Sequence, residues 1–267
     1  MASTRDYHLI VSDFDETLGN QEKVINPKVI SAVERWISSG RRFSIATGRQ
    51  YLMITDVIEK LGLVDPIITR GGAEIVDPKD GKIIYSKSID SKTVKEFIDF
   101  LDGKGLKLAI EHEDVIYSDY YKRSDYIPII TFKPLNEFSI SGAPKMLIFA
   151  IDGDVEKKVS FVKNELTNKF PQLFIVSRHS SRGLAWDVTS EKATKHLSVL
   201  KLIKLLNLNR EKTVGVGDGY NDFPLLEACG YKVAMGNANQ ELKEIADMIV
   251  PDYKNDGVAY LIDKLLE

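Results

Sequence analysis

Residues 7–17, with the sequence YHLIVSDFDET, place two carboxylates at the end of a short apolar run. The run from Tyr7 to Ser12 is bounded by acidic and turn residues, which is typical of a buried parallel strand. Asp13 and Asp15 follow it directly, so we expect both side chains to project from the carboxyl end of that strand. Ligands of open α/β sheets bind outside these strand ends, which makes this stretch the first candidate for a functional site.

Both terminal parts of the chain alternate between helical and strand-like segments. Pro27 opens a helical pattern and Gly40 lies just past its end, the asymmetry expected of a helix. The other segments are strands at 42–46, 66–69, 213–216, 231–234 and 248–250, and helices at 51–61, 193–206, 220–228 and 240–246. This alternation predicts a parallel α/β domain made of residues 1–81 and 187–267.

The middle of the chain, residues 82–186, has a different pattern. Strand-like segments lie at 107–111, 115–117, 145–151, 173–177 and 184–188, and helical patterns lie at 91–101 and 155–168. Strands here outnumber helices, so we expect an α+β module inserted into the α/β domain.

Composition bounds the possible functions. The chain has 267 residues, 43% hydrophobic and 28% charged, with a net charge of -3. This is an ordinary globular composition, and it offers no electrostatic case for nucleic acid or a membrane surface as partner. We find no apolar window of membrane-spanning length and no signal peptide, so we expect a cytoplasmic protein. No long uninterrupted apolar surface helix stands out, and we expect a monomer or a weak homo-oligomer.

Two acidic loops suggest phosphate and metal chemistry. In the first, Asp13 and Asp15 can divide the work of attacking phosphorus and handling the leaving-group proton. In the second, residues 217–222 form the sequence GDGYND directly after a predicted strand. Its carboxylates and amide, together with those of the first loop, are natural ligands or supports for Mg²⁺.

Two further segments supply groups that suit a phosphate. Thr47 and Gly48 offer a hydroxyl and a backbone N–H at a strand-to-helix turn. Lys195, near the start of a helix, can neutralise phosphate charge, and Lys192 is the competing candidate.

Together and in this order, the four segments resemble the haloacid dehalogenase (HAD) superfamily, and most closely its Cof-like phosphatases with a type IIB cap. The residues that match the four motifs are Asp13, Asp15 and Thr17; Thr47; Lys195; and Asp218, Asn221 and Asp222. The tail VAMGNANQELKEIADMIV also resembles this group.

The resemblance implies a doubly wound, Rossmann-like parallel-sheet core with an inserted α+β cap at residues 82–186 that sets substrate specificity. It implies a Mg²⁺-dependent phosphatase that hydrolyses a small-molecule phosphate monoester, a sugar phosphate or a related metabolite, through an aspartyl-phosphate intermediate.

The resemblance also assigns roles to residues. Asp13 is the nucleophile, Asp15 the acid and then the base, and Lys195 the cation that offsets phosphate charge. Thr47, Gly48 and Asn221 are expected to hold phosphate oxygens. The expected Mg²⁺ set is the Asp13 and Asp218 carboxylates and the Asp15 backbone carbonyl, supported by Asp222. Candidates for contacting the substrate are Arg49, Arg123, Arg178, His179 and Arg182.

Two positions depart from the pattern of this group. Position 16 is Glu where relatives usually have Gly, and position 71 is Gly where they usually have Asn. Two other functions remain open, a phosphomutase or other phosphotransferase and a non-catalytic protein that binds a phosphometabolite. A nucleotide-binding oxidoreductase lacks support, because no G-x-G-x-x-G follows the first strand.

Overall fold

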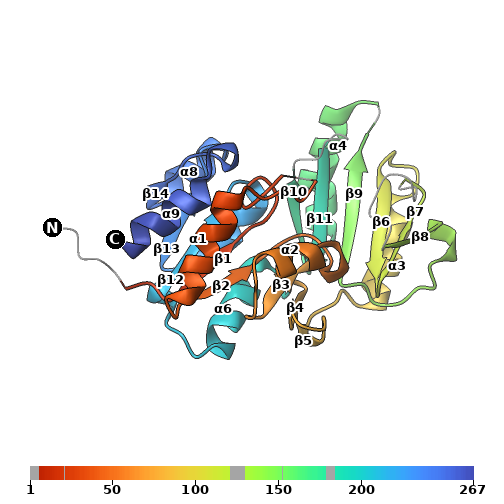
Figure 1. Cartoon of the computed structure of the whole chain (residues 1–267). Coiled ribbons are helices and arrows are strands. Elements are labelled where there is room, and N and C mark those ends of the chain that lie inside the picture. Colours follow the sequence, from red (N-terminus) through yellow and green to blue (C-terminus); the bar gives the residue numbers. More distant parts are fainter. Residues whose placement is uncertain (1–5, 21, 121–129, 152, 179–183) are drawn as a thin grey trace. The chain divides into compact units, whose positions relative to one another are not determined.

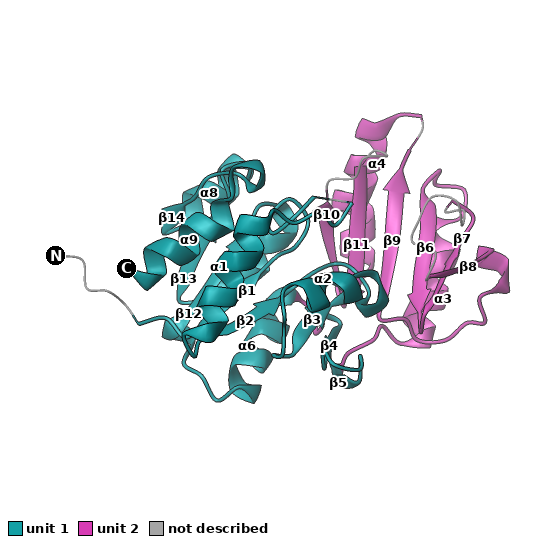
Figure 2. Ribbon diagram, in the orientation of Figure 1, with its two compact units in different colours: residues 1–85, 195–267 teal, residues 86–194 magenta. Residues whose placement is uncertain are grey.

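The computed structural model describes residues 6–20, 22–120, 130–151, 153–178 and 184–267. The chain forms two compact units (Figures 1 and 2), unit 1 with residues 1–85 and 195–267 and unit 2 with residues 86–194. Sequence analysis predicted domain boundaries after residues 81 and 186. Both lie before the boundaries of the structure, which fall after residues 85 and 194. The second expected boundary falls inside strand β11 (Leu184–Ser190), which belongs wholly to the sheet of unit 2.

Unit 1 is built on a parallel five-stranded sheet with the order β14-β13-β12-β1-β2. The strands are β1 (Leu9–Ser12), β2 (Arg42–Ile45), β12 (Thr213–Gly217), β13 (Tyr231–Ala234) and β14 (Met248–Ile249). The chain winds from β1 to β2 on one side, and from β12 through β13 to β14 on the other. The strand order therefore reverses between β1 and β12, and in doubly wound sheets ligands bind at that switch point.

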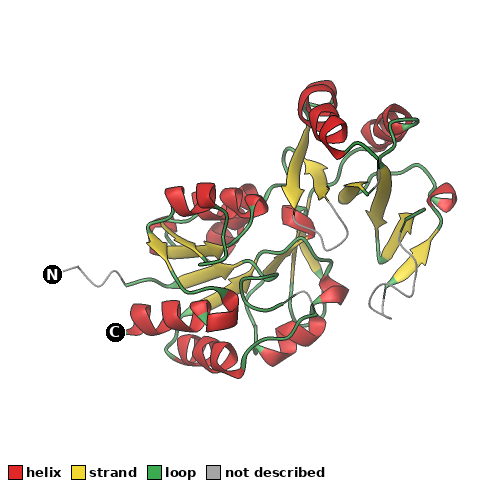
Figure 3. Ribbon diagram, turned by 90° about the horizontal axis from the view of Figure 1, so that it is seen from above, coloured by secondary structure: helices red, strands yellow, loops and turns green. Residues whose placement is uncertain are grey.

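Helices cover both faces of this sheet (Figure 3). They are α1 (Pro27–Ser38), α2 (Thr55–Lys60), α6 (Lys195–Leu205), α7 (Phe223–Ala228), α8 (Gln240–Ile245) and α9 (Gly257–Leu266). Asn26 caps α1 by accepting the Lys28 N–H, and Pro27 occupies its first position. Apolar residues of α6 and α7 pack in one core cluster with Leu9 and Val11 of β1. This packing fixes the start of α6, and hence Lys195, beside the central strands.

A smaller sheet of β3 (Ile67–Thr69), β4 (Glu74–Val76) and β5 (Ile83–Ser86) also belongs to unit 1, except for Ser86 at the end of β5. A parallel bridge between Ala46 and Ile68 connects β3 to the segment after β2. Sequence analysis did not predict β4 and β5. The helix predicted at 51–61 is divided, because a 3-10 turn at Tyr51–Met53 precedes α2.

Unit 2 contains a six-stranded sheet with the order β10-β11-β9-β6-β7-β8. Its strands are β6 (Lys107–His112), β7 (Val115–Ser118), β8 (Thr131–Lys133), β9 (Lys145–Ala150), β10 (Leu173–Arg178) and β11 (Leu184–Ser190). Its helices are α3 (Ser91–Leu101), α4 (Val155–Phe161) and α5 (Thr167–Lys169), the last two joined by a π-helical turn. Helices and strands share one apolar cluster that includes Phe97, Leu166 and Trp186.

The fold confirms the prediction of a doubly wound α/β core with an inserted α+β module. Within the described ranges, none of the helices combines the length and the apolar character needed to cross a membrane.

Candidate active site

The candidate residues of unit 1 lie at the carboxyl ends of its central strands. Asp13 follows β1 and Asp218 follows β12, so both flank the switch point of the sheet. Thr47 lies just beyond β2, and Lys195 is the first residue of α6. The topology thus gathers side chains that are far apart in the sequence.

Lys195 bridges two of these carboxylates. Its Nζ lies 2.6 Å from Asp13 Oδ1 and 2.6 Å from Asp222 Oδ1, and all three side chains are buried. Burial alone lowers the pKa of Lys195, but the charges of Asp13 and Asp222 outweigh it and raise that pKa above its ordinary value. The ammonium therefore stays charged. Lys192, the competing candidate, is exposed.

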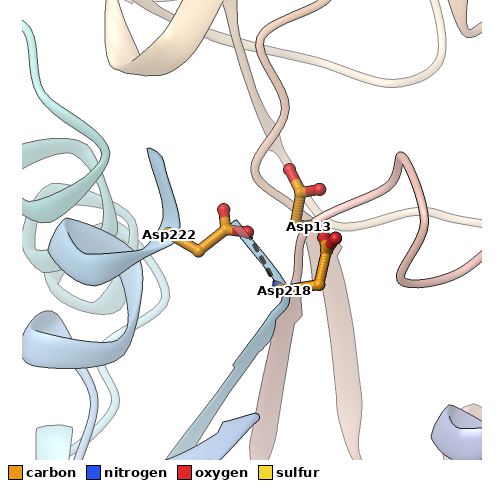
Figure 4. A group of neighbouring side chains, drawn as sticks. All are labelled: Asp13, Asp218 and Asp222. Atoms are coloured by element: carbon orange, nitrogen blue, oxygen red, sulfur yellow. Dashed lines mark hydrogen bonds between the residues drawn. The ribbon is translucent and has the colours of Figure 1, made fainter. Parts of the chain in front are cut away.

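Asp222 organises the loop that follows β12. Its Oδ2 accepts the backbone N–H groups of Asp218 and Gly219, each at 3.0 Å; Figure 4 shows the first of these bonds. A Cβ on Gly217 would lie 2.6 Å from Asp222 Cβ and Cγ, so a side chain at position 217 would displace this carboxylate. With Lys195 on its other oxygen, Asp222 is occupied on both sides by protein donors.

Three carboxylates converge at this point (Figure 4). Asp13, Asp218 and Asp222 each offer an oxygen within 4.8 Å of the others. Burial and then the charge of Asp222 raise the pKa of Asp13 to about 7. The same two causes raise the pKa of Asp218 to about 9. Lys195 contacts only two of these three carboxylates, and gathering their negative charge in a buried site is costly. These residues fit a hard divalent cation such as Mg²⁺, because it takes oxygen ligands and would neutralise the excess charge.

Asp218 is held by a donor on each oxygen. Thr17 Oγ1 donates to Asp218 Oδ1 at 3.0 Å, and Asn237 Nδ2 donates to Asp218 Oδ2 at 3.2 Å. Asn237 Nδ2 also donates to the backbone carbonyl of Glu16 at 2.9 Å. Sequence analysis missed Asn237, although it lies shortly after β13 at the same edge of the sheet. Its place shortly after a predicted parallel strand was the sequence signal that could have identified Asn237 as a site residue.

Asp15 pairs with Arg49 in two-pronged geometry. Arg49 Nε lies 2.9 Å from Asp15 Oδ2, and Arg49 Nη2 lies 2.5 Å from Asp15 Oδ1. The guanidinium also lies 5.3 Å from the centre of the Phe14 ring. Arg49, expected as a substrate contact, is therefore engaged with the predicted acid–base residue.

The expected phosphate-binding residues lie in two loops at the same sheet edge. Thr47 is buried, and its Oγ1 accepts the Arg49 N–H at 3.1 Å. A hydroxyl that accepts one bond still has a hydrogen to donate. Gly48 follows Thr47, and Asn221 lies in the 3-10 turn Tyr220–Asp222 of the Asp222 loop.

A model of the haloacid dehalogenase-like hydrolase family matches residues 10–262. The chain belongs to this family. The match includes every motif residue above, and it confirms the predicted superfamily and the predicted class of enzyme, an HAD hydrolase.

The proteins that are similar to this chain over nearly its whole length include phosphatases. Phosphatase YwpJ of Bacillus subtilis is 26% identical, over 97% of this chain and 99% of its own. A 5-amino-6-(5-phospho-D-ribitylamino)uracil phosphatase of the same organism, YwtE, is 25% identical over 96% of this chain and 97% of its own. A solved HAD subclass IIB sugar phosphatase superposes with a TM-score of 0.81 and 25% identity, covering 96% of this chain and 98% of its own.

The two departures from the HAD pattern both occupy left-handed backbone. Gly71 has φ 71°, a conformation that glycine adopts freely and that asparagine tolerates better than most residues, so the Gly-for-Asn difference is conformationally mild. Glu16 has φ 59°, where a residue with a Cβ is strained and glycine is not. The local backbone thus explains the glycine usual in HAD relatives.

The candidate substrate residues of the inserted module lie in unit 2. Arg178 ends β10, and its Nη1 lies 3.5 Å from Asp187 Oδ1. Asp187 also pairs with the buried Lys145 at 3.0 Å. His179, Arg123 and Arg182 lie outside the described residues.

Proposed function

We propose that this protein is a Mg²⁺-dependent phosphatase that hydrolyses a small-molecule phosphate monoester through an aspartyl-phosphate on Asp13. The observation that carries the proposal is the Lys195 bridge between Asp13 and Asp222 at the sheet's switch point, with Asp218 beside it. The similar phosphatases support a sugar phosphate or a related metabolite as substrate.

In the first step, an Asp13 carboxylate oxygen forms a bond to phosphorus while the bond from phosphorus to the ester oxygen breaks. The leaving alkoxide takes a proton from the Asp15 carboxyl group. In the second step, water attacks phosphorus, the bond to Asp13 breaks and Asp15 accepts the water proton. One group serves both steps because the first leaves it in the protonation state that the second needs.

Electrostatics is the main obstacle, since an anionic carboxylate must approach an anionic phosphate. Lys195, whose raised pKa keeps it charged, offsets this repulsion beside Asp13. Thr47, Gly48 and Asn221 would hold the phosphate oxygens in the strand-end loops.

The metal would be held by the Asp13 and Asp218 carboxylates and the Asp15 backbone carbonyl. When bound, Mg²⁺ supplies positive charge that opposes the repulsion between carboxylate and phosphate. We assign Asp222 to support, because Lys195 and two backbone N–H groups already occupy its oxygens. We assign unit 2, with Arg178, to selection of the leaving group.

The test is phosphate release from p-nitrophenyl phosphate and a panel of sugar phosphates, each with Mg²⁺ and with EDTA. Wild type should release phosphate only with Mg²⁺, and Asp13→Asn should release none while keeping its fold by circular dichroism. Full activity of Asp13→Asn would remove Asp13 as nucleophile. Full activity in EDTA would remove the metal requirement.

A further inference from the structure

Asn237 connects two loops that the proposed function assigns to metal binding. One hydrogen bond runs from Nδ2 to Asp218 Oδ2 at 3.2 Å, and the other runs from Nδ2 to the Glu16 carbonyl at 2.9 Å. An amide nitrogen carries two hydrogens, so a single side chain can serve both acceptors. Glu16 directly follows Asp15, whose carbonyl we assign to the metal.

The hydrogen-bond network fixes which way this amide faces. Asn237 Oδ1 accepts the Tyr253 N–H at 3.2 Å. A flipped amide would place Oδ1 against the Glu16 carbonyl and the Asp218 carboxylate, which are both acceptors, and would turn Nδ2 toward the Tyr253 N–H, which is a donor. Only the observed orientation satisfies all three partners.

The contacts around Asp218 leave it suited to a cation. Thr17 donates to one oxygen and Asn237 to the other, which restrains rotation of the carboxylate. A carboxylate has about four acceptor positions, so two donors leave lone pairs for a metal.

We propose that Asn237 is a positioning residue that orients the Asp218 carboxylate and ties it to the Asp13–Glu16 loop for divalent cation binding. This inference rests on the proposed function, because it takes Asp218 as a metal ligand. Partners that orient metal ligands typically contribute about 10- to 100-fold to metal affinity.

The experiment measures cation binding without turnover. Mg²⁺ alone is titrated into metal-free wild type and Asn237→Ala by calorimetry, and the dissociation constant should rise about 10- to 100-fold in the variant. Turnover gives a second readout, in which the Mg²⁺ concentration for half-maximal rate rises while the rate at saturating Mg²⁺ stays near that of wild type. A general loss of folded protein would instead lower the rate at saturating Mg²⁺ and leave the half-maximal Mg²⁺ concentration unchanged.

A matched control and a second variant distinguish a specific effect on Mg²⁺ binding from a loss of folded protein. Asn209 caps a 3-10 turn at the amino end of β12, the end opposite Asp218, so Asn209→Ala should bind Mg²⁺ as wild type does. Asn237 is exposed, and its replacement leaves no buried cavity. If Asn237→Ala still fails to fold, Asn237→Ser decides, because its shorter side chain cannot span both acceptors and should also weaken binding.

The outcomes separate this inference from the proposed function. Wild-type affinity in folded Asn237→Ala, or in Asn237→Ser should the alanine variant not fold, overturns the role of Asn237 and leaves the phosphatase proposal intact. A wild type that binds no Mg²⁺ overturns the metal site itself, and the inference with it.

Discussion

The Lys195 ammonium lies 2.6 Å from the Asp13 carboxylate in a buried site, and it contacts Asp222 at the same distance. The predicted nucleophile is thus paired with a cation before any substrate arrives. The same contact that favours approach of an anionic phosphate also compensates two buried charges in the resting protein.

Replacing Lys195 by Met should therefore harm activity and stability together. We expect phosphatase activity to fall by at least about 100-fold. We also expect urea unfolding to show a loss of about 3–5 kcal/mol, because Asp13 and Asp222 lose their counter-charge. Lys204→Met, on the exposed part of the same helix, is the control and should behave as wild type. Unchanged turnover in Lys195→Met would contradict the assigned role.

The metal-free protein should become less stable as pH rises. Asp13 and Asp218 have pKa values of about 7 and about 9 in the folded protein, against an ordinary value of 3.8. Between the ordinary pKa and these raised values, the folded state binds more protons than the unfolded state. The stability that Asp13 and Asp218 contribute is therefore fully present below an ordinary carboxyl pKa, and it is lost as pH rises through their pKa values in the folded protein.

Urea unfolding in EDTA between about pH 5 and about pH 9 measures this dependence. Asp218→Asn should flatten the upper part of the curve, and saturating Mg²⁺ should reduce the slope because the cation replaces the protons. A slope in Asp218→Asn equal to that of wild type would argue against the raised pKa of Asp218.

Glu16 stores backbone strain that glycine would relieve. Because the backbone φ at position 16 is 59°, we expect Glu16→Gly to be about 1 kcal/mol more stable than Glu16→Ala. Both variants remove the carboxylate, which lies close enough to raise the pKa of Asp218, so the comparison isolates the backbone effect. Equal urea midpoints for the two variants would show that position 16 is not strained.

The Arg49–Asp15 pair predicts a dependence on the leaving group. If Arg49 orients Asp15 for proton donation, Arg49→Gln should slow hydrolysis of alkyl phosphates much more than that of p-nitrophenyl phosphate. The nitrophenolate leaves without needing a proton, whereas an alkoxide does. An equal loss on both substrates would instead indicate a general role in the structure.

Much of the site was predictable because its residues lie in short segments directly after strands. Asp13, Asp218 and Asp222 could be located from apolar runs followed by acidic loops, and parallel topology then brings the strand ends together. The preference for Lys195 over Lys192 came from the family resemblance. The structure adds a physical reason, since only Lys195 is buried between two carboxylates.

Other features depend on distances that the sequence pattern does not contain. The Asp15–Arg49 pair and the two bonds of Asn237 arise from side chains on different strand-end loops. The strands β4, β5 and β8 were missed, although β1 and β3 are as short and were predicted. β5 and β8 are largely exposed and so lack a buried apolar run, and β4 has only three residues shortly after a 3-10 turn. The break before α2 has no proline or glycine to mark it.

The central claim is that phosphate becomes covalently attached to Asp13. Wild type is mixed with Mg²⁺ and a radiolabelled phosphate ester that it hydrolyses, quenched in acid within the first turnover and digested for peptide mapping. The proposed mechanism predicts label on the peptide that contains Asp13, and none on that peptide from Asp13→Asn. Mg²⁺-dependent phosphate release with label on no peptide, or only on a peptide without Asp13, would contradict it.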